Sequence, residues 1–257
     1  MKSFVRWSAT LGLVGSTLLG SSFIGNLQAI ALPPDQVAKT VGNVPMFTIT
    51  DDKGAPLVRS VKNEQNNNVS VTGVFVSQRD AQSFIDQLKK ENPTLARQVR
   101  VSPVSLGEVY KLGEANQNKP DRLNFAFVPM QQQVTSAMAL LRQNGQQVQQ
   151  FNGVPLFVAK AGPDQGYLTI QEGGKQIIPF FFEKEQLQGM VDRFKQQKPD
   201  LASTVKIQVV NLQGVLQALR SSNNPQLNNV VLVPTKESLD FLRKLPSAAP
   251  ANQQRRR

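Results

Sequence analysis

The sequence predicts a mixed α/β protein made of two tandem, related units. One observation is a set of segments that recur in the same order: residues 42–47 (GNVPMF) return as residues 152–157 (NGVPLF), and residues 92–101 resemble residues 198–207. The other is that apolar residues alternate in some segments and follow helical spacing in others. We therefore expect two β-β-β-α-β-α-β-α repeats with pseudo-two-fold symmetry, whose antiparallel or mixed sheets are covered by helices on one face.

Each unit is expected to open with three strands. The first strand carries a Val-Pro-x-Phe segment, at 44–47 in one unit and at 154–157 in the other. Residues that favour turns follow at 51–54 and 162–166. The remaining strands of this group are predicted around 56–60 and 70–77 in the first unit, and at 166–171 and 176–183 in the second.

A helix is expected after the three strands. Positions 81, 84, 85 and 88 are apolar at i, i+3, i+4 and i+7, and positions 187, 190, 191 and 194 repeat that spacing. Pro93 and Pro199 stand just beyond these segments, where prolines end helices. The later elements of each unit are an alternating strand (99–101 or 205–209), a short helix from Leu106 or Leu212, a strand ending in Val-Pro (128–129 or 233–234), and a last helix carrying Val134 or Leu239.

The two ends of the chain are expected to lie outside the repeated body. Lys2 and Arg6 precede an uncharged stretch of small and apolar residues, and residues 29–31 (AIA) form a small-residue cleavage site. This order is typical of a secretory signal peptide, with a membrane anchor as the alternative. The expected organisation is a signal peptide at 1–31, a first α/β repeat at 32–150, a second at 151–246 and a disordered basic tail at 247–257.

The composition restricts the chemistry that this chain can perform. It has no Cys and no His, which removes thiol nucleophiles, thiolate metal sites and the commonest general base. No phosphate-binding glycine loop and no nucleophile elbow occurs. The neighbouring acids Asp51 and Asp52 fall in a turn, and Glu183 and Glu185 fall at a helix start, where acids complement the helix dipole. We therefore expect no enzymatic activity, no catalytic residue, no cofactor and no metal site.

Aromatic strand residues form the candidate polypeptide-binding site. Phe180, Phe181 and Phe182 are consecutive, so the first and third point to one face of a strand and the second to the other. Phe75 poses the same question in the first unit. Two interpretations stay open. Both faces are covered and these side chains belong to the core, or one face lines a groove that takes an extended or helical apolar polypeptide.

An excess of positive charge is the second candidate feature. The chain has 29 Lys and Arg against 18 Asp and Glu, a formal net charge of +11, and loss of the signal peptide removes two of these positive charges. Lys195 and Lys198 are the candidate partner-binding residues. The export signal and the lack of interleaved aromatic residues argue against nucleic acid, and favour anionic lipid, an acidic polymer or an acidic protein face. An unspecialised solvated surface is the alternative.

Several motifs resemble one known family. They are Val-Pro-x-Phe-x-x-x-Asp at 44–51, Gly-x-Pro-Leu at 54–57, Val-Phe-Val-Ser-x-x-Asp-Ala at 74–81, Val-Pro-Leu-Phe at 154–157 and the Pro-Phe-Phe-Phe strand at 179–182. Over residues 38–246 the chain resembles the intermembrane-space subunit of the chloroplast inner-envelope translocon, in its cyanobacterial form. The resemblance implies a non-enzymatic factor with two related halves and hydrophobic pockets, which helps precursor proteins cross the space between two membranes.

Two functional hypotheses follow from the residues and the resemblance together. The first is a soluble, chaperone-like transport factor that binds apolar segments of precursor polypeptides or outer-membrane proteins, in outer-membrane biogenesis or in translocation across the envelope. The alternative is a structural adaptor that tethers outer-membrane assembly machinery through a basic surface. The signal peptide places either one in the periplasm, with the thylakoid lumen as the other destination. We expect a monomer that contacts membranes only peripherally and does not bind nucleic acid.

Overall fold

The computed structural model describes residues 12–14, 32–62, 68–119, 122–222 and 224–244. The predicted signal peptide therefore lies outside the described residues except for 12–14, and the predicted basic tail lies wholly outside them. Within the described ranges, no helix combines the length and the apolar character that crossing a bilayer requires.

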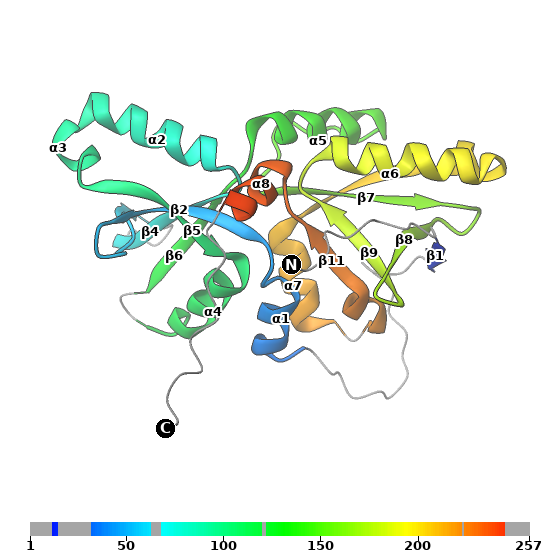
Figure 1. Cartoon of the computed structure of the whole chain (residues 1–257), viewed down its shortest axis with the longest axis horizontal. Helices are drawn as coiled ribbons and strands as arrows, with labels where there is room; N and C mark the ends of the chain where they lie inside the picture. Colours follow the sequence, from blue (N-terminus) through cyan, green and yellow to red (C-terminus); the bar gives the residue numbers. More distant parts are fainter. Residues whose placement is uncertain (1–11, 15–31, 63–67, 120–121, 223, 245–257) are drawn as a thin grey trace, which may run out of the picture.

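The first sheet is built from the first repeat (Figure 1). Its central strands β2 and β4 are antiparallel, β5 pairs antiparallel with β2, and β6 pairs parallel with β4. β3 forms an antiparallel hairpin with the first part of β4. The five strands are β2 (Pro45–Asp51), β3 (Arg59–Lys62), β4 (Asn68–Phe75), β5 (Val99–Ser105) and β6 (Leu123–Val128).

The second sheet repeats this pattern of pairing. β7 is antiparallel to both β9 and β10, β11 is parallel to β9, and β8 and β9 form a hairpin. A further strand, β1, pairs with the outer edge of β8. The strands are β1 (Gly12–Val14), β7 (Pro155–Ala161), β8 (Gly166–Glu172), β9 (Lys175–Phe181), β10 (Lys206–Asn211) and β11 (Val230–Val233). Equivalent strands therefore pair in the same directions in the two sheets, and the predicted mixed α/β class is confirmed.

The helices begin and end where local residues favour it. The Ser77 hydroxyl accepts a hydrogen bond from the Asp80 N–H at the start of α2, and Pro93 follows its end. The helices are α1 (Pro34–Thr40), α2 (Gln78–Glu91), α3 (Pro93–Ala96), α4 (Leu106–Asn116), α5 (Gln131–Gln143), α6 (Lys184–Gln197), α7 (Leu212–Ser221) and α8 (Lys236–Lys244), with 3₁₀ turns η1 (Pro199–Thr204) and η2 (Pro225–Asn229).

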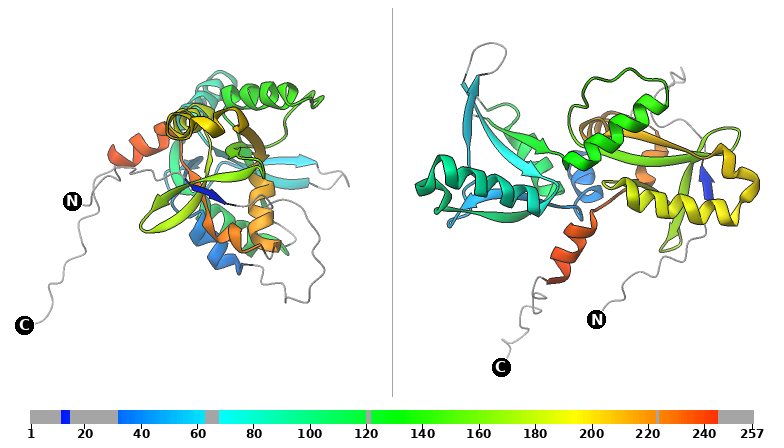
Figure 2. Two further views of the ribbon diagram at one scale, coloured as in Figure 1. Left: turned by 90° about the vertical axis from the view of Figure 1, so that its right-hand side faces the viewer. Right: turned by 90° about the horizontal axis from the view of Figure 1, so that it is seen from above.

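The last helix of each repeat packs on the sheet of the other repeat. α5 lies beside α6 above the second sheet, where it contacts β7 and β10 (Figure 1). α8 packs on β2 of the first sheet, and its Phe241 meets Phe47. α1 lies between the halves, against α4 of the first and α7 of the second (Figure 2). The two repeats therefore share their helices and a central core.

Helices pack against both faces of the second sheet and against part of both faces of the first, so the expectation of helices on one face is wrong. The inner faces meet α1, α4 and α7 in a central core that contains Met46, Val74, Leu156 and Ile178. The outer faces have separate cores. One combines Phe157 of the second sheet with apolar residues of α5 and α6, and the other lies between the first sheet, α2 and α8. Alternate residues of the central strands therefore belong to different cores.

Candidate apolar binding site

The three consecutive phenylalanines of the second repeat are core residues. Phe180, Phe181 and Phe182 expose 2%, 3% and 1% of their surface. Phe180 and Phe182 belong to the central core, and Phe181 belongs to the outer core together with residues of α6. Because both faces of β9 are covered, the groove interpretation is wrong at these three positions, and the core interpretation is correct.

An apolar groove lies instead on the outer face of the first sheet, beside the β3–β4 hairpin. Phe75, the remaining predicted residue, is 5% exposed and lies at the groove. Phe84 of α2 is 42% exposed, and its ring meets the Phe75 ring at a centroid distance of 5.9 Å and an interplanar angle of 60°. The groove encloses about 360 Å³ and is lined by Ile49, Leu57, Arg59, Val61, Val71, Thr72, Gly73, Phe75, Phe84 and Val128.

Gly73 shapes the groove next to Phe75. A Cβ built at Gly73 would lie 2.9 Å from Cε2 of Phe75, closer than carbon atoms normally approach. The missing side chain therefore leaves space in which the Phe75 ring lies over the strand, as glycines in strands do where another group approaches closely. This local feature sets the position of the aromatic ring that Phe84 contacts.

The matching face of the second sheet is closed. Met190 occupies in α6 the position that Phe84 occupies in α2, yet it is 1% exposed. α5 lies beside α6 and adds Ala137 to the outer core there. On the first sheet the corresponding helix, α8, packs on β2 through Phe241, and the surface above β3 and β4 stays open beside Phe84. The groove therefore distinguishes the two halves.

The predicted partner-binding residues lie elsewhere. Lys195 is in the last turn of α6, and Lys198 caps that helix. Both are exposed, and neither forms an ion pair with a described carboxylate. They lie on the helix that covers the second sheet, whereas the groove belongs to the first. The structure therefore does not bring the predicted cationic and aromatic residues together in one site.

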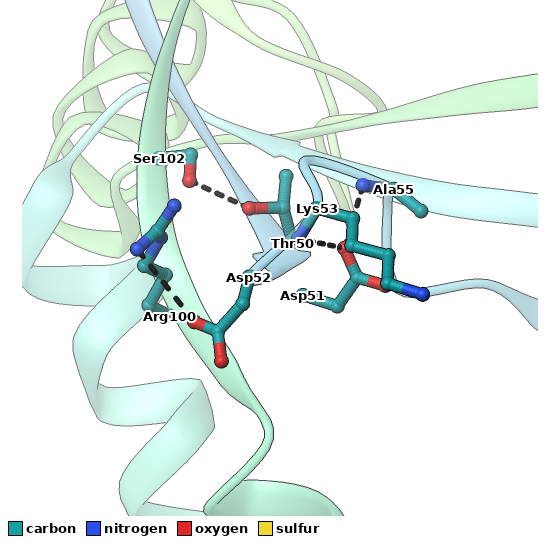
Figure 3. A network of polar contacts seen from close by, with 7 residues as sticks. All are labelled: Thr50, Asp51, Asp52, Lys53, Ala55, Arg100 and Ser102. Carbon is teal, nitrogen blue, oxygen red and sulfur yellow. Dashed lines mark hydrogen bonds and ion pairs between the residues drawn. The ribbon is translucent and has the colours of Figure 1, made fainter.

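The acidic pair in the β2–β3 connection is structural. One Asp51 carboxylate oxygen accepts hydrogen bonds from the backbone N–H groups of Lys53 and Ala55, at 2.9 and 2.8 Å. Asp52 points away and lies 3.6 Å from the Arg100 guanidinium (Figure 3). The two carboxylates stabilise a turn and a surface contact, as the sequence predicted for a solvated turn.

The second acidic pair holds the exchanged helices in place. A Glu183 carboxylate oxygen accepts the Lys236 N–H at the start of α8, at 2.9 Å. The side-chain amide of Gln133 in α5 makes two hydrogen bonds to this region. Its Nε2 donates to the Glu185 carboxylate at 2.8 Å, and its Oε1 accepts the Lys184 backbone N–H at 3.0 Å. Gln133 is buried. Both acids therefore connect α6 to helices that cross between the repeats.

Sequence reasoning missed most of the groove. The helical spacing places Phe84 on the apolar face of its helix, which predicts a core residue. Leu57 precedes β3 and Val61 lies within it, and neither stands in a helical or alternating apolar pattern that indicates a groove. Nothing local separates Phe84 from Met190, because both occupy the same position in matched helices. The exposure of one and the burial of the other depend on which helix packs beside them.

The fold and the site define a two-sheet α/β protein with exchanged terminal helices and an apolar groove on one half. A family model of Tic22-like proteins matches residues 12–244. The chain belongs to the Tic22-like family. The resemblance noted from the sequence motifs is thereby confirmed, and the chain is a cyanobacterial-type member.

Solved structures and characterised relatives agree with this assignment. The structure is similar to Anabaena Tic22, a protein-transport protein, with a TM-score of 0.76 and 38% identity over 85% of this chain and 100% of that one. Tic22 from Plasmodium falciparum shares the fold, with a TM-score of 0.60 and 20% identity over 81% of this chain and 96% of that one. The chloroplast protein TIC 22 of Pisum sativum is 22% identical over 89% of this chain and 84% of its own length.

Proposed function

We propose that this chain is a non-enzymatic protein-transport factor that holds an apolar segment of a precursor polypeptide in the groove beside Phe84. The half-exposed Phe84 ring over Phe75 is the observation that supports this most directly. Exposed aromatic side chains in a concave apolar surface are typical of binding sites. Similarity to Anabaena Tic22, a protein-transport protein, supports the same class of function.

The size of the groove suits weak and reversible binding. Its volume of about 360 Å³ accommodates a few client side chains. Burying one Leu or Phe side chain contributes about 1.5–3 kcal/mol, whereas association costs about 4–15 kcal/mol. Binding is therefore weak, because the free energy gained by burial is close to the cost of association. A factor that carries a polypeptide and then releases it needs weak binding of this kind, and such binding requires neither a nucleotide nor a covalent step. If apolar contacts dominate, binding tolerates salt, whereas steering by the basic surface makes it sensitive to salt.

The test is Phe84→Ser, compared with Leu112→Ser. Leu112 is exposed by 50%, lies on α4 and does not line the groove, so it is a matched control for the loss of an exposed apolar side chain. Binding of an unfolded outer-membrane β-barrel protein should weaken about tenfold in Phe84→Ser and remain unchanged in Leu112→Ser, with both variants folded by circular dichroism. Equal binding by the two variants would contradict the proposal.

A photo-crosslinking residue placed at position 84 gives a second readout. It should capture the client at that position, whereas the same residue at position 112 should not. Substitutions such as Phe180→Ser are unsuitable for this purpose. Phe180 is a central-core residue, and opening a cavity of that size costs about 3–5 kcal/mol of stability. Loss of binding in that variant would report loss of the fold.

An adaptor role through the basic surface is the second proposal. Lys195 and Lys198 are exposed within one turn of each other and form no ion pair with described residues, so they are free to meet an acidic partner. Exchanging both for Glu should abolish capture of outer-membrane assembly proteins and leave client binding intact. If capture persists in the double variant but is lost in Phe84→Ser, the groove is the binding element and the adaptor proposal fails.

We further propose that the chain acts as an exported monomer in an envelope space, the periplasm or alternatively the thylakoid lumen. The signal peptide predicted from the N-terminal sequence supports export, and the chloroplast location of the Pisum sativum relative fits an envelope-associated role. N-terminal sequencing of the protein recovered from fractionated cells should begin after Ala31. Light scattering should give the mass of one chain. A full-length chain in the cytoplasm would contradict the proposal.

A further inference from the structure

The outer edge of β8 is occupied by a short strand from the N-terminal segment. Gly12, Leu13 and Val14 of β1 pair antiparallel with Thr169, Leu168 and Tyr167. The other edge of β8 is already used by β7 and β9. β1 belongs to the segment predicted to be a signal peptide, so removal of residues 1–31 takes away the strand that covers this edge. The processed chain then presents unpaired backbone N–H and C=O groups at 167–169.

This edge lacks the protection that natural edge strands usually carry. The corresponding strand of the first sheet, β3, has Arg59 and Lys62 at its ends, and charges of this kind discourage strand addition. β8 contains no charge from Gly166 to Gln171. Its residues Tyr167 and Thr169 are of types that favour strands, which suits pairing with another strand. The edge strands of the two hairpins therefore differ in charge: β3 is protected against the addition of another strand, and β8 is not.

We propose that, after the leader is removed, the β8 edge binds an extended, uncharged segment of a client polypeptide as an added antiparallel strand. The occupant seen in the structure defines the chemistry: at least three consecutive residues without charge and without proline, of the small and apolar type of Gly-Leu-Val. Main-chain hydrogen bonds provide affinity with little dependence on side-chain identity, which suits a factor with many clients. The client class and the removal of the leader rest on the function and the export proposed above, whereas the pairing of β1 with β8 does not.

The groove and the β8 edge lie on different sheets, so they make separate contacts. The groove belongs to the outer face of the first sheet and takes apolar side chains. The β8 edge belongs to the second sheet and forms hydrogen bonds with the backbone of an added strand. If the Phe84→Ser experiment contradicts binding in the groove, the strand-addition proposal is unaffected. If the hydrogen-exchange experiment contradicts strand addition at β8, binding in the groove is unaffected.

Hydrogen exchange measured by mass spectrometry tests the proposal without changing a core residue. The materials are the full chain, the chain as processed in cells, and a synthetic peptide of residues 8–18 (SATLGLVGSTL). The amides within 167–169 that β1 covers should exchange about tenfold faster in the processed chain than in the full chain. Added peptide should restore their protection. The same peptide with Leu13→Pro, which lacks one backbone N–H and disfavours strand pairing, should not.

A full chain carrying Leu13→Pro provides the matched protein variant. It should expose the β8 amides and bind the unmodified peptide, whereas the unaltered full chain should not bind it because its own β1 occupies the edge. The amides of β7 should stay protected throughout, which shows that the second sheet remains folded.

Four results would overturn the proposal. The first is equal protection of 167–169 in the full and processed chains, with no effect of the peptide. The second is protection that rises with protein concentration in the absence of peptide, which identifies a second copy of the chain as the occupant. The third is peptide-dependent protection around the groove at 71–84 rather than at β8. The fourth is faster exchange of the β7 amides in the processed chain. That result would show that the second sheet needs β1 in order to stay folded, so that β1 is a permanent part of the fold.

Discussion

The Phe47 ring of β2 and the Phe241 ring of α8 meet edge to face, with their centroids 5.2 Å apart and their planes at 85°. Phe47 belongs to the first repeat and Phe241 to the second, and Phe47 has no exposed surface. The opposite exchange places Ala137 of α5 in the outer core of the second sheet. Each repeat thus completes the core of the other, and we expect the folding of the two halves to be coupled.

Phe241→Ala should destabilise the whole protein rather than α8 alone. The loss combines an aromatic pair, about 0.5–1.5 kcal/mol, with the burial of part of the side chain, so a decrease in the free energy of unfolding of about 2 kcal/mol is expected. Urea unfolding monitored by circular dichroism measures it. Leu242→Ala is the control, because Leu242 is 43% exposed and should change stability by less than about 0.5 kcal/mol. Equal effects of the two substitutions would show that the exchanged contact is unimportant.

Gly107→Ala should disturb the contact between α1 and α4. A Cβ at Gly107 would lie 2.4 Å from the backbone oxygen of Ala38 and 2.9 Å from the Cα of Gly42, and neither atom belongs to a flexible side chain. We expect a loss of about 2 kcal/mol in the free energy of unfolding. Gly113→Ala, in the same helix, places its Cβ 3.9 Å from Phe125 and should instead stabilise the protein by up to about 1 kcal/mol. Thermal unfolding compares the pair, and a destabilised Gly113→Ala would refute this explanation.

Glu108 makes the start of α4 sensitive to acid. The Ser105 N–H donates to its carboxylate and the Ser105 hydroxyl accepts the Glu108 N–H, both at 3.0 Å, which forms a capping box. The hydrogen bond from the Ser105 backbone lowers the pKa of Glu108 from its ordinary value of 4.5. Since the folded pKa is lowered, the stabilisation is present above pH 4.5 and is lost as the pH falls through the folded pKa.

Two variants separate the hydrogen bond from the charge of Glu108. Glu108→Ala should cost about 0.5–1 kcal/mol at neutral pH because the cap is lost. Glu108→Gln keeps an acceptor but does not titrate, so the difference in stability between it and the natural chain should shrink below pH 4.5. Urea unfolding measures the stability of both variants and of the natural chain. The measurements run from about pH 3 to about pH 7, which includes the range over which a carboxyl group titrates. A constant difference across that range would show that the carboxylate contributes nothing through its charge.

Tyr167 should make the protein sensitive to alkali. Burial raises its pKa to about 12 from the ordinary 10.0. Because the folded pKa is raised, the native state loses stability as the pH rises from 10 towards 12, where the unfolded chain ionises first. Tyr167→Phe should lose less stability over this window than the natural chain. Lys160, whose ammonium lies 4.4 Å from the ring centroid, has a pKa lowered by burial and is unchanged in both proteins. Identical alkaline unfolding of the two proteins would refute the role of Tyr167.

The sequence predicted the elements better than it predicted the site. The strands around Phe75 and Phe180 and the helices around Phe84 and Met190 all occur, because alternation and helical spacing are local properties that the sequence displays directly. The run of three phenylalanines allowed either a core or a groove. The structure assigns them to the core because α6 and the central helices cover both faces of β9.

The sequence alone determined the mixed α/β class, the family, and the order of strands and helices within each repeat apart from β1, α1 and α3, since these depend on spacing and on recurring motifs. Tertiary structure decided which apolar side chains are buried. Phe84 and Met190 occupy matched positions in matched helices, yet one is half-exposed and the other enclosed. Burial depends on neighbours distant in the chain, here the helices α5 and α8 that cross between the repeats. No local pattern specifies that exchange, because its stabilising contacts form only when both sheets are in place.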